Sequence, residues 1–221
     1  MKLLAASLVA LASLSAQAGV PRKLGPPEKK PADAGVAAAP AEAKAAKGPA
    51  ETEHAVAGDP PMLKVGEDAP VFNGLLHNAA EAGMNSVDLS AMVGGDAEND
   101  GTKVVLVSFF ATWCKPCKKE LPFLVALDKE LRSQGLRIVS VAIDKEEEKW
   151  PEIQRLVKEN GVTFPVVKDR YNLIARRFLG DKTALPSVFL VGRDGLVKLV
   201  KQGYPNDAAE FLRAEIDKAL K

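Results

Sequence analysis

The residues with the most distinctive chemistry in this chain are its two cysteines, Cys114 and Cys117, which are separated by only two residues. Two cysteines are too few for a disulfide-stapled scaffold, and this pair is too close to close a long loop. A thiolate can attack a disulfide, and a second thiol nearby can displace the product. The spacing therefore predicts local thiol-disulfide chemistry.

The segments on either side of the pair predict where the two sulfur atoms lie. Residues 104–110 form a nearly continuous apolar run, which is typical of a strand covered on both faces. Helical spacing follows over residues 115–134, and Gly135 ends it. The cysteines therefore fall at a helix N-terminus, where unpaired N–H groups and the helix dipole stabilise a thiolate. We expect Cys114 to be the nucleophile and Cys117 the thiol that resolves the mixed disulfide.

Two plainer interpretations of the pair are an ordinary core position and a structural zinc site. Buried cysteines can be ordinary core residues, but a Trp-Cys-Lys-Pro-Cys segment at a strand-to-helix junction favours a redox motif. A structural zinc site would need two further ligands, and neither His54 nor His77 has metal-type spacing to the pair. We therefore expect no bound metal and no cofactor.

The rest of the chain alternates between strand-like and helix-like segments. Short strands are expected near 71–72 and 87–89, before the cysteines. After the first helix the order is strand, helix, short strand, helix, strand, turn, strand and helix, over 138–143, 147–160, 166–167, 171–178, 187–191, 192–195, 196–201 and 207–220. A βαβ unit followed by a ββα unit predicts an α/β fold, with a central mixed sheet and helices on both faces.

Three parts are expected along the chain. Residues 1–18 have the basic start, short apolar run and small residues of a cleavable signal peptide; an uncleaved membrane anchor is the alternative interpretation. The apolar run is too short to span a bilayer, so no transmembrane segment is expected after cleavage. Residues 19–61 are rich in Ala and Pro and are predicted to form a disordered spacer. Residues 62–221 are predicted to form one domain, exported to the periplasm where the cell has one.

The overall charge of the chain does not indicate a class of binding partner. Lys and Arg total 30 against 29 Asp and Glu, so the net charge of +1 provides no field that would attract nucleic acid.

The block Phe109 to Pro122 resembles the active-site segment of the thioredoxin superfamily, specifically its exported TlpA/ResA-like branch. Three later segments, at 162–166, 185–191 and 194–195, occur in the order and spacing of that branch. The resemblance extends from about Val65 to the C-terminus. It implies a thioredoxin-like fold with an added N-terminal β-hairpin and an inserted helix.

The same resemblance implies how a substrate is held. Pro186 is expected to be a cis proline that faces the cysteines, and the backbone before it is expected to pair with the substrate chain like an added strand. The residues expected to bind substrate are Trp113, Lys115, Pro116, Leu185 and Pro186.

A proton acceptor for the resolving step is less obvious. Many thioredoxins carry a buried acid six residues before the first cysteine, but this chain has Ser108 there. Glu120 lies one helical turn after Cys117 and matches a glutamate that members of this branch are thought to use. Our hypothesis is that Glu120 accepts the proton of Cys117; the alternative is a solvated surface glutamate.

The resemblance implies a disulfide reductase for exported proteins, such as apocytochrome c or proteins that assemble copper sites. A membrane thiol reductant of the DsbD/CcdA type would supply its electrons. Two alternatives remain. A peroxiredoxin would need threonine where this chain has Ala111, and a copper-binding chaperone would use a three-residue cysteine spacing and a distant histidine. His77 is not in the position expected for that ligand and is expected to be a surface residue.

Overall fold

The computed structural model describes residues 62–98, 100–181 and 184–221. The predicted signal peptide at 1–18 and the predicted spacer at 19–61 lie outside the described residues. Within the described ranges, no helix is both long enough and apolar enough to cross a membrane.

A five-stranded mixed sheet forms the centre of the domain, in the order β5-β4-β3-β6-β7. Strands β3, β4 and β5 are parallel, β6 runs antiparallel to β3, and β7 runs antiparallel to β6. Their bounds are Val104–Phe110 (β3), Leu136–Ala142 (β4), Val166–Lys168 (β5), Ser187–Gly192 (β6) and Val197–Gln202 (β7). All seven residues of β3 are buried, which confirms a strand covered on both faces.

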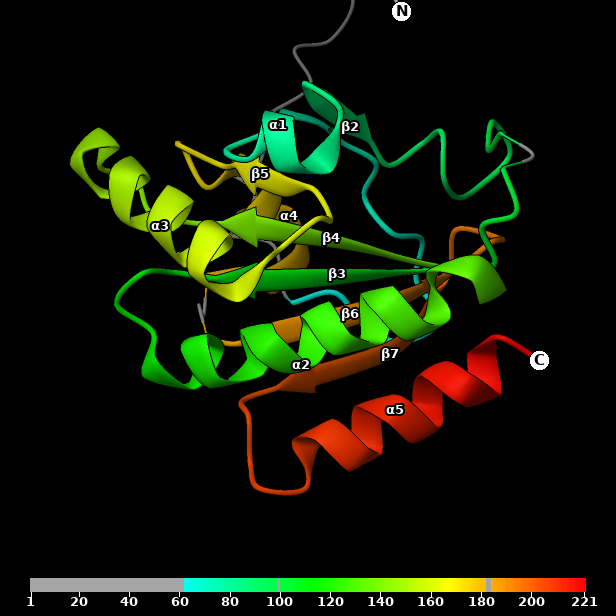
Figure 1. Ribbon diagram of the computed structural model, residues 1–221. Helices are drawn as coiled ribbons and strands as arrows, with labels where there is room; N and C mark the ends of the chain where they lie inside the picture. The colour runs from blue at the N-terminus through cyan, green and yellow to red at the C-terminus, as the bar shows by residue number, and fades with distance from the viewer. Residues whose placement is uncertain (1–61, 99, 182–183) are drawn as a thin grey trace, which may run out of the picture. The chain divides into compact units, whose positions relative to one another are not determined.

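Helices cover both faces of this sheet, as predicted. Helices α2 and α5 lie in front of the sheet in Figure 1, and α4 lies behind it. The bounds are Lys115–Leu131 (α2), Trp150–Asn160 (α3), Leu173–Leu179 (α4) and Ala208–Ala219 (α5). Short 3₁₀ turns extend α2 over Arg132–Gln134 and precede α3 over Glu147–Lys149. The mixed sheet between helical layers is a thioredoxin-like α/β fold, and α3 lies between β4 and β5, where the inserted helix was expected.

An antiparallel pair of short strands precedes β3. Strand β1 covers Asn73–Leu75 and β2 covers Ser86–Asp88, with the single-turn helix α1 (Ala79–Ala82) between them. The predicted position of the first strand, 71–72, was two residues too early. The inward residue of β1 is Gly74, whose Cα packs so closely on Val167 of β5 that no side chain fits there. An apolar pattern cannot reveal a strand whose buried position is a glycine.

Aromatic rings fix α4 against the back of the sheet. Phe178 of α4 packs on Phe109 of β3 and Phe189 of β6, with ring centroids 5.3 and 5.2 Å away. All three side chains are fully buried. Edge-to-face and tilted pairs of this kind add to the stabilisation from burial alone.

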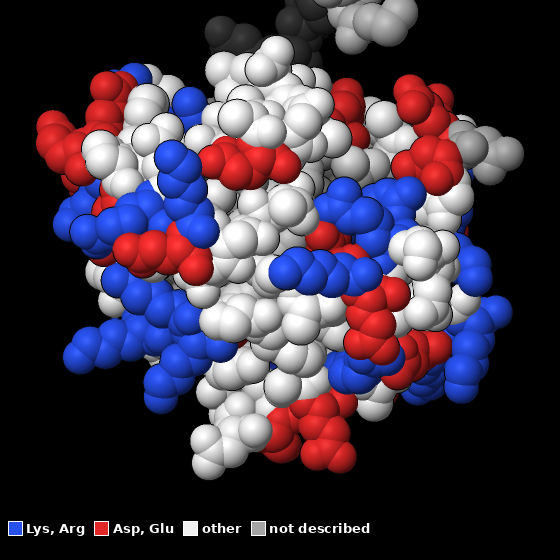
Figure 2. Space-filling view, viewed as in Figure 1, with Lys and Arg blue, Asp and Glu red and all other residues white. Residues whose placement is uncertain are grey.

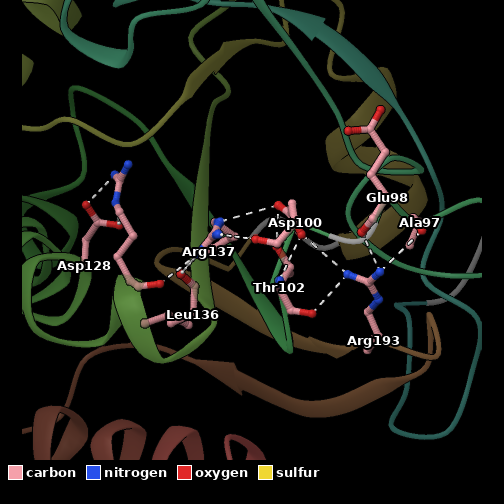
Figure 3. A network of polar contacts seen from close by, with 9 residues as sticks. Ala97, Glu98, Asp100, Thr102, Asp128, Leu136, Arg137 and Arg193 are labelled. Carbon is pink, nitrogen blue, oxygen red and sulfur yellow. Dashed lines mark hydrogen bonds and ion pairs between the residues drawn. The ribbon is translucent and has the colours of Figure 1, made fainter.

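The loop that leads into β3 is held by Arg193, which follows β6. Its guanidinium donates hydrogen bonds to the backbone carbonyls of Ala97, Glu98 and Thr102, and it forms an ion pair with Asp100 (Figure 3). Gly192, the residue before Arg193, pairs with Val104 at the N-terminal end of β3, while the cysteines follow the C-terminal end of that strand. This network therefore stabilises the end of the sheet that is remote from the cysteines.

Candidate active site

The cysteine pair lies where β3 gives way to α2. Cys114 is the N-cap residue of α2 in an extended conformation, and Pro116 occupies the first turn. The two cysteines are joined by a disulfide, and both are almost fully buried. The backbone N–H of Cys117 donates to Cys114 Sγ at 3.2 Å. After reduction, this N–H and the helix dipole would stabilise a thiolate on Cys114.

A buried carboxylate fixes the loop that carries Cys114. Asp144, which follows β4, accepts hydrogen bonds from the backbone N–H of Thr112 at 3.0 Å and from its hydroxyl at 2.6 Å. Both side chains are buried. Because Thr112 is two residues before Cys114, this contact holds the nucleophile in place relative to the parallel strands. Sequence reasoning missed Asp144; its only signal is an acid directly after a buried strand.

The proline loop borders the same edge of the sheet. Ser187 of β6 pairs with Phe109 of β3, so Pro186 lies beside the end of β3 from which the chain continues to Cys114. The Leu185–Pro186 peptide bond is cis, as the resemblance implied. The carbonyl of Pro186 accepts a hydrogen bond from the N–H of Gly203 at 2.7 Å, which ties this loop to the segment after β7.

The residues expected to bind substrate differ in exposure. Trp113 is 63% exposed, and Lys115 and Pro116 are also exposed, so these three are open to a partner. Leu185 is half-buried and Pro186 is buried. Figure 2 shows Lys and Arg side chains gathered at the left of this face, where Figure 1 places the start of α2. The role of these five residues, Trp113, Lys115, Pro116, Leu185 and Pro186, in substrate binding stays a prediction.

Glu120 is not the surface residue that the alternative interpretation describes. It lies on α2 one turn after Cys117, its exposed fraction is 2%, and it faces the sheet. The hydroxyl of Ser108 on β3 donates to Glu120 Oε2 at a long 3.4 Å. Burial raises the pKa of Glu120 to about 7, because desolvation penalises the carboxylate more than Ser108 and Lys201 stabilise it. A carboxyl group with this pKa can both accept and release a proton near neutral pH.

Two further residues near Glu120 were missed by sequence reasoning. Lys201 of β7 stabilises the carboxylate electrostatically, and the charge of Glu120 in turn helps burial to raise the pKa of Tyr204. Both side chains are half-buried. They are far from Glu120 in sequence. The strand register places Lys201 in the same row as Ser108, and Tyr204 follows two residues after the end of β7.

His77 was expected to be a surface histidine, and this was wrong. It is 6% exposed and stacks edge-to-face on Trp150 of α3, with ring centroids 5.6 Å apart. Its Nδ1 atom is buried without a hydrogen-bond partner. Burial, helped by Lys168, lowers the pKa of His77 to about 4, so the ring is neutral at neutral pH. No group of three or more potential metal ligands occurs among the described residues.

Comparison with known proteins agrees with this geometry. The model of the AhpC/TSA family matches residues 65–200. The chain is 32% identical to the thiol-disulfide oxidoreductase ResA of Bacillus subtilis, over 58% of this chain and 75% of the relative. It is 30% identical to the ResA of Oceanobacillus iheyensis, over 66% and 68% of the two chains.

A solved structure agrees as well. The thiol:disulfide interchange protein of the thioredoxin family from Chlorobium tepidum is 28% identical, with a TM-score of 0.55 over 71% of this chain and 97% of that one. The family model covers well over half of the chain and the paired cysteines lie within it. The chain therefore belongs to the AhpC/TSA family and is a thiol-disulfide oxidoreductase with a thioredoxin-like fold.

Proposed function

We propose that this enzyme works after export, in the periplasm or an equivalent compartment, as a dithiol donor that reduces disulfides in exported proteins. The observation that carries the proposal is the Cys114–Cys117 pair at the start of α2, with the buried Glu120 one turn behind it. A pair at a helix N-terminus favours the thiolate needed for attack, and a carboxyl group with a pKa of about 7 suits proton transfer near neutral pH.

The reaction begins with the reduced enzyme. The Cys114 thiolate attacks one sulfur of the substrate disulfide, that S–S bond breaks, and the other substrate sulfur leaves as a thiolate, which takes up a proton from solvent. The product of this step is a mixed disulfide between Cys114 and the substrate.

The second step releases the substrate. Cys117 gives its proton to the Glu120 carboxylate, and the resulting thiolate attacks Cys114 Sγ. The mixed disulfide breaks, the second substrate sulfur leaves as a thiolate, and the Cys114–Cys117 disulfide forms. Two electrons have passed to the substrate, and a membrane thiol reductant of the DsbD/CcdA type returns the enzyme to its dithiol form.

The surface around the cysteines supports protein substrates. The exposed side chains of Trp113, Lys115 and Pro116 surround the buried sulfurs, and the Leu185–Pro186 segment lies at the same edge of the sheet. An extended substrate segment can dock there by backbone pairing with the residue before the proline. Resemblance to the TlpA/ResA-like branch favours apocytochrome c or copper-site assembly proteins as substrates.

Trapping of the mixed disulfide tests this proposal. The Cys117→Ser variant should accumulate a covalent complex with an exported disulfide protein, since its first step proceeds and its second cannot. The Cys114→Ser variant, which keeps one thiol of the same pair, should form none. If both variants trapped substrate equally, Cys114 would not be the nucleophile.

Two assays separate this proposal from the alternatives. Rapid turnover of hydrogen peroxide would favour a peroxiredoxin, although Ala111 occupies the position where that chemistry needs threonine. Stoichiometric binding of Cu(I) by the reduced protein would favour a copper chaperone. We expect the enzyme to show neither.

A further inference from the structure

The buried carboxyl group of Glu120 needs electrostatic help if it is to accept a proton. Desolvation favours its neutral form, and a neutral carboxylic acid cannot take the proton of Cys117. The described groups that act on it are the Ser108 hydroxyl from β3 and the Lys201 ammonium from β7. Of these two, only Lys201 carries a charge.

The strand register places Lys201 on the correct face of the sheet. Ser108 pairs with Val188 of β6, and Val188 pairs with Lys201 of β7. Directly paired residues project to the same face of a sheet, so Ser108, Val188 and Lys201 form one row. Because the Ser108 hydroxyl contacts Glu120, this row faces α2.

The Lys201 side chain stays on that face. Its Nζ atom lies 4.7 Å from the ring centroid of Phe211 on α5. In Figure 1, α2 and α5 lie side by side in front of the sheet, and they are in direct contact. The ammonium group is therefore held under α5, beside the helix that carries Glu120.

The end of β7 is also tied to the proline loop. Tyr204 follows Gly203, whose N–H donates to the carbonyl of Pro186 at 2.7 Å. The phenol group of Tyr204 is half-buried, and the carboxylate of Glu120 helps to raise its pKa. Tyr204 and Lys201, with Cys117 on the same helix as Glu120, are the titratable groups that this arrangement brings toward the carboxyl group.

We propose that Lys201 is a positioning residue for the resolving step, in which its ammonium keeps Glu120 ionised and able to take the proton of Cys117. This inference rests on the proposed role of Glu120. It assigns to the last strand of the sheet a function in a reaction whose cysteines belong to a distant segment.

The test replaces Lys201 with methionine, which keeps the aliphatic stem and removes the charge. Loss of the cation disfavours the carboxylate, so the pKa of Glu120 should rise. A rise of about one pH unit from about 7 would lower the ionised fraction at pH 7 about fivefold and leave it almost unchanged at pH 9. Resolution should therefore slow about fivefold at pH 7 and recover at pH 9.

Two measurements on the whole protein follow these effects. Carbon-13 NMR of labelled glutamate carboxyl groups gives the pKa of Glu120 in the oxidised protein, in which the cysteines do not titrate. Stopped-flow oxidation of the reduced protein at saturating oxidised glutathione gives the pH profile of resolution. Lys201→Arg should restore both. Lys198→Met is the matched control, because it removes a charge from the same strand at a residue paired with Asp194 instead.

The outcomes distinguish the two claims. An unchanged pKa of Glu120 in Lys201→Met would overturn the inference and leave the proposed function intact. A raised pKa with an unchanged pH profile would overturn the role of Glu120 as proton acceptor, and with it the positioning role of Lys201. An equal effect of Lys198→Met would show that only the general charge of β7 matters, which would also overturn the inference.

Discussion

Replacing Glu120 with glutamine should make the protein more stable at alkaline pH. The pKa of this carboxyl group is about 7 in the folded protein, against an ordinary value of 4.5. The folded state therefore binds the proton more tightly than the unfolded chain does. The stability that this protonated group contributes is fully present below pH 4.5. It is lost as the pH rises through 7, because the folded protein must then bury a carboxylate. At about 1.4 kcal/mol per pH unit between these values, the loss reaches about 3 kcal/mol at pH 8.

Glutamine has nearly the same shape as glutamate and can still accept a hydrogen bond from Ser108, but it does not ionise. Its advantage in unfolding free energy should grow from less than about 1 kcal/mol at pH 5 to about 3 kcal/mol at pH 8. Urea unfolding of the oxidised protein, followed by tryptophan fluorescence, measures this difference without titrating the thiols.

The control is Glu146→Gln, which alters an exposed glutamate in the loop after β4. This substitution should shift the unfolding free energy by a similar small amount at both pH values. A Glu120→Gln effect of equal size at pH 5 and pH 8 would refute the reasoning, since it would mean that the carboxyl group of Glu120 titrates alike in the folded and unfolded states.

Three further predictions concern other parts of the domain. His77→Phe should have a free energy of unfolding about 2 kcal/mol higher than that of the parent protein at pH 4.5, and little higher at pH 7.5, as measured by urea unfolding. The reason is that the lowered pKa of His77 destabilises the parent protein as the pH falls from 6.5 towards 4. Asp144→Asn should weaken the hold on Thr112, lower the unfolding free energy by about 1 to 3 kcal/mol and slow the attack of Cys114 in stopped-flow assays; an unchanged rate would show that this contact does not position the nucleophile. Phe178→Ala should lower the unfolding free energy by about 3 to 5 kcal/mol in urea, and a loss below about 1 kcal/mol would contradict the packing of α4 described above.

Local patterns in the sequence predicted most of the fold. The buried run at 104–110, the helix from Lys115 and its termination at Gly135 all agree with the structure, because strand burial, helix spacing and a glycine in a left-handed conformation are local properties. The cis conformation of the Leu185–Pro186 bond followed from the resemblance to the thioredoxin superfamily. The other expected elements overlap the observed ones, with ends that differ by up to two residues, but the first short strand, expected at 71–72, does not overlap β1, whose buried residue is Gly74.

The residues that act on Thr112 and Glu120 could not be predicted in the same way. Asp144 and Lys201 reach the site through the register of strands that are far apart in sequence, and one unremarkable acid or lysine does not reveal that register. The burial of His77 depends on packing against Trp150 of the inserted helix, which hydrophobic periodicity around a lone histidine does not signal. Contacts made between elements therefore had to come from the structure.

The reduction potential of the Cys114–Cys117 couple tests the central claim most directly. It can be measured by equilibrating the protein with glutathione or dithiothreitol buffers and quantifying the dithiol form. We predict a value near that of thioredoxin, about −270 mV, which would let the enzyme donate electrons to disulfides in exported proteins. A value near −120 mV, typical of a strong oxidant, would mean that the enzyme introduces disulfides and would contradict the proposed direction.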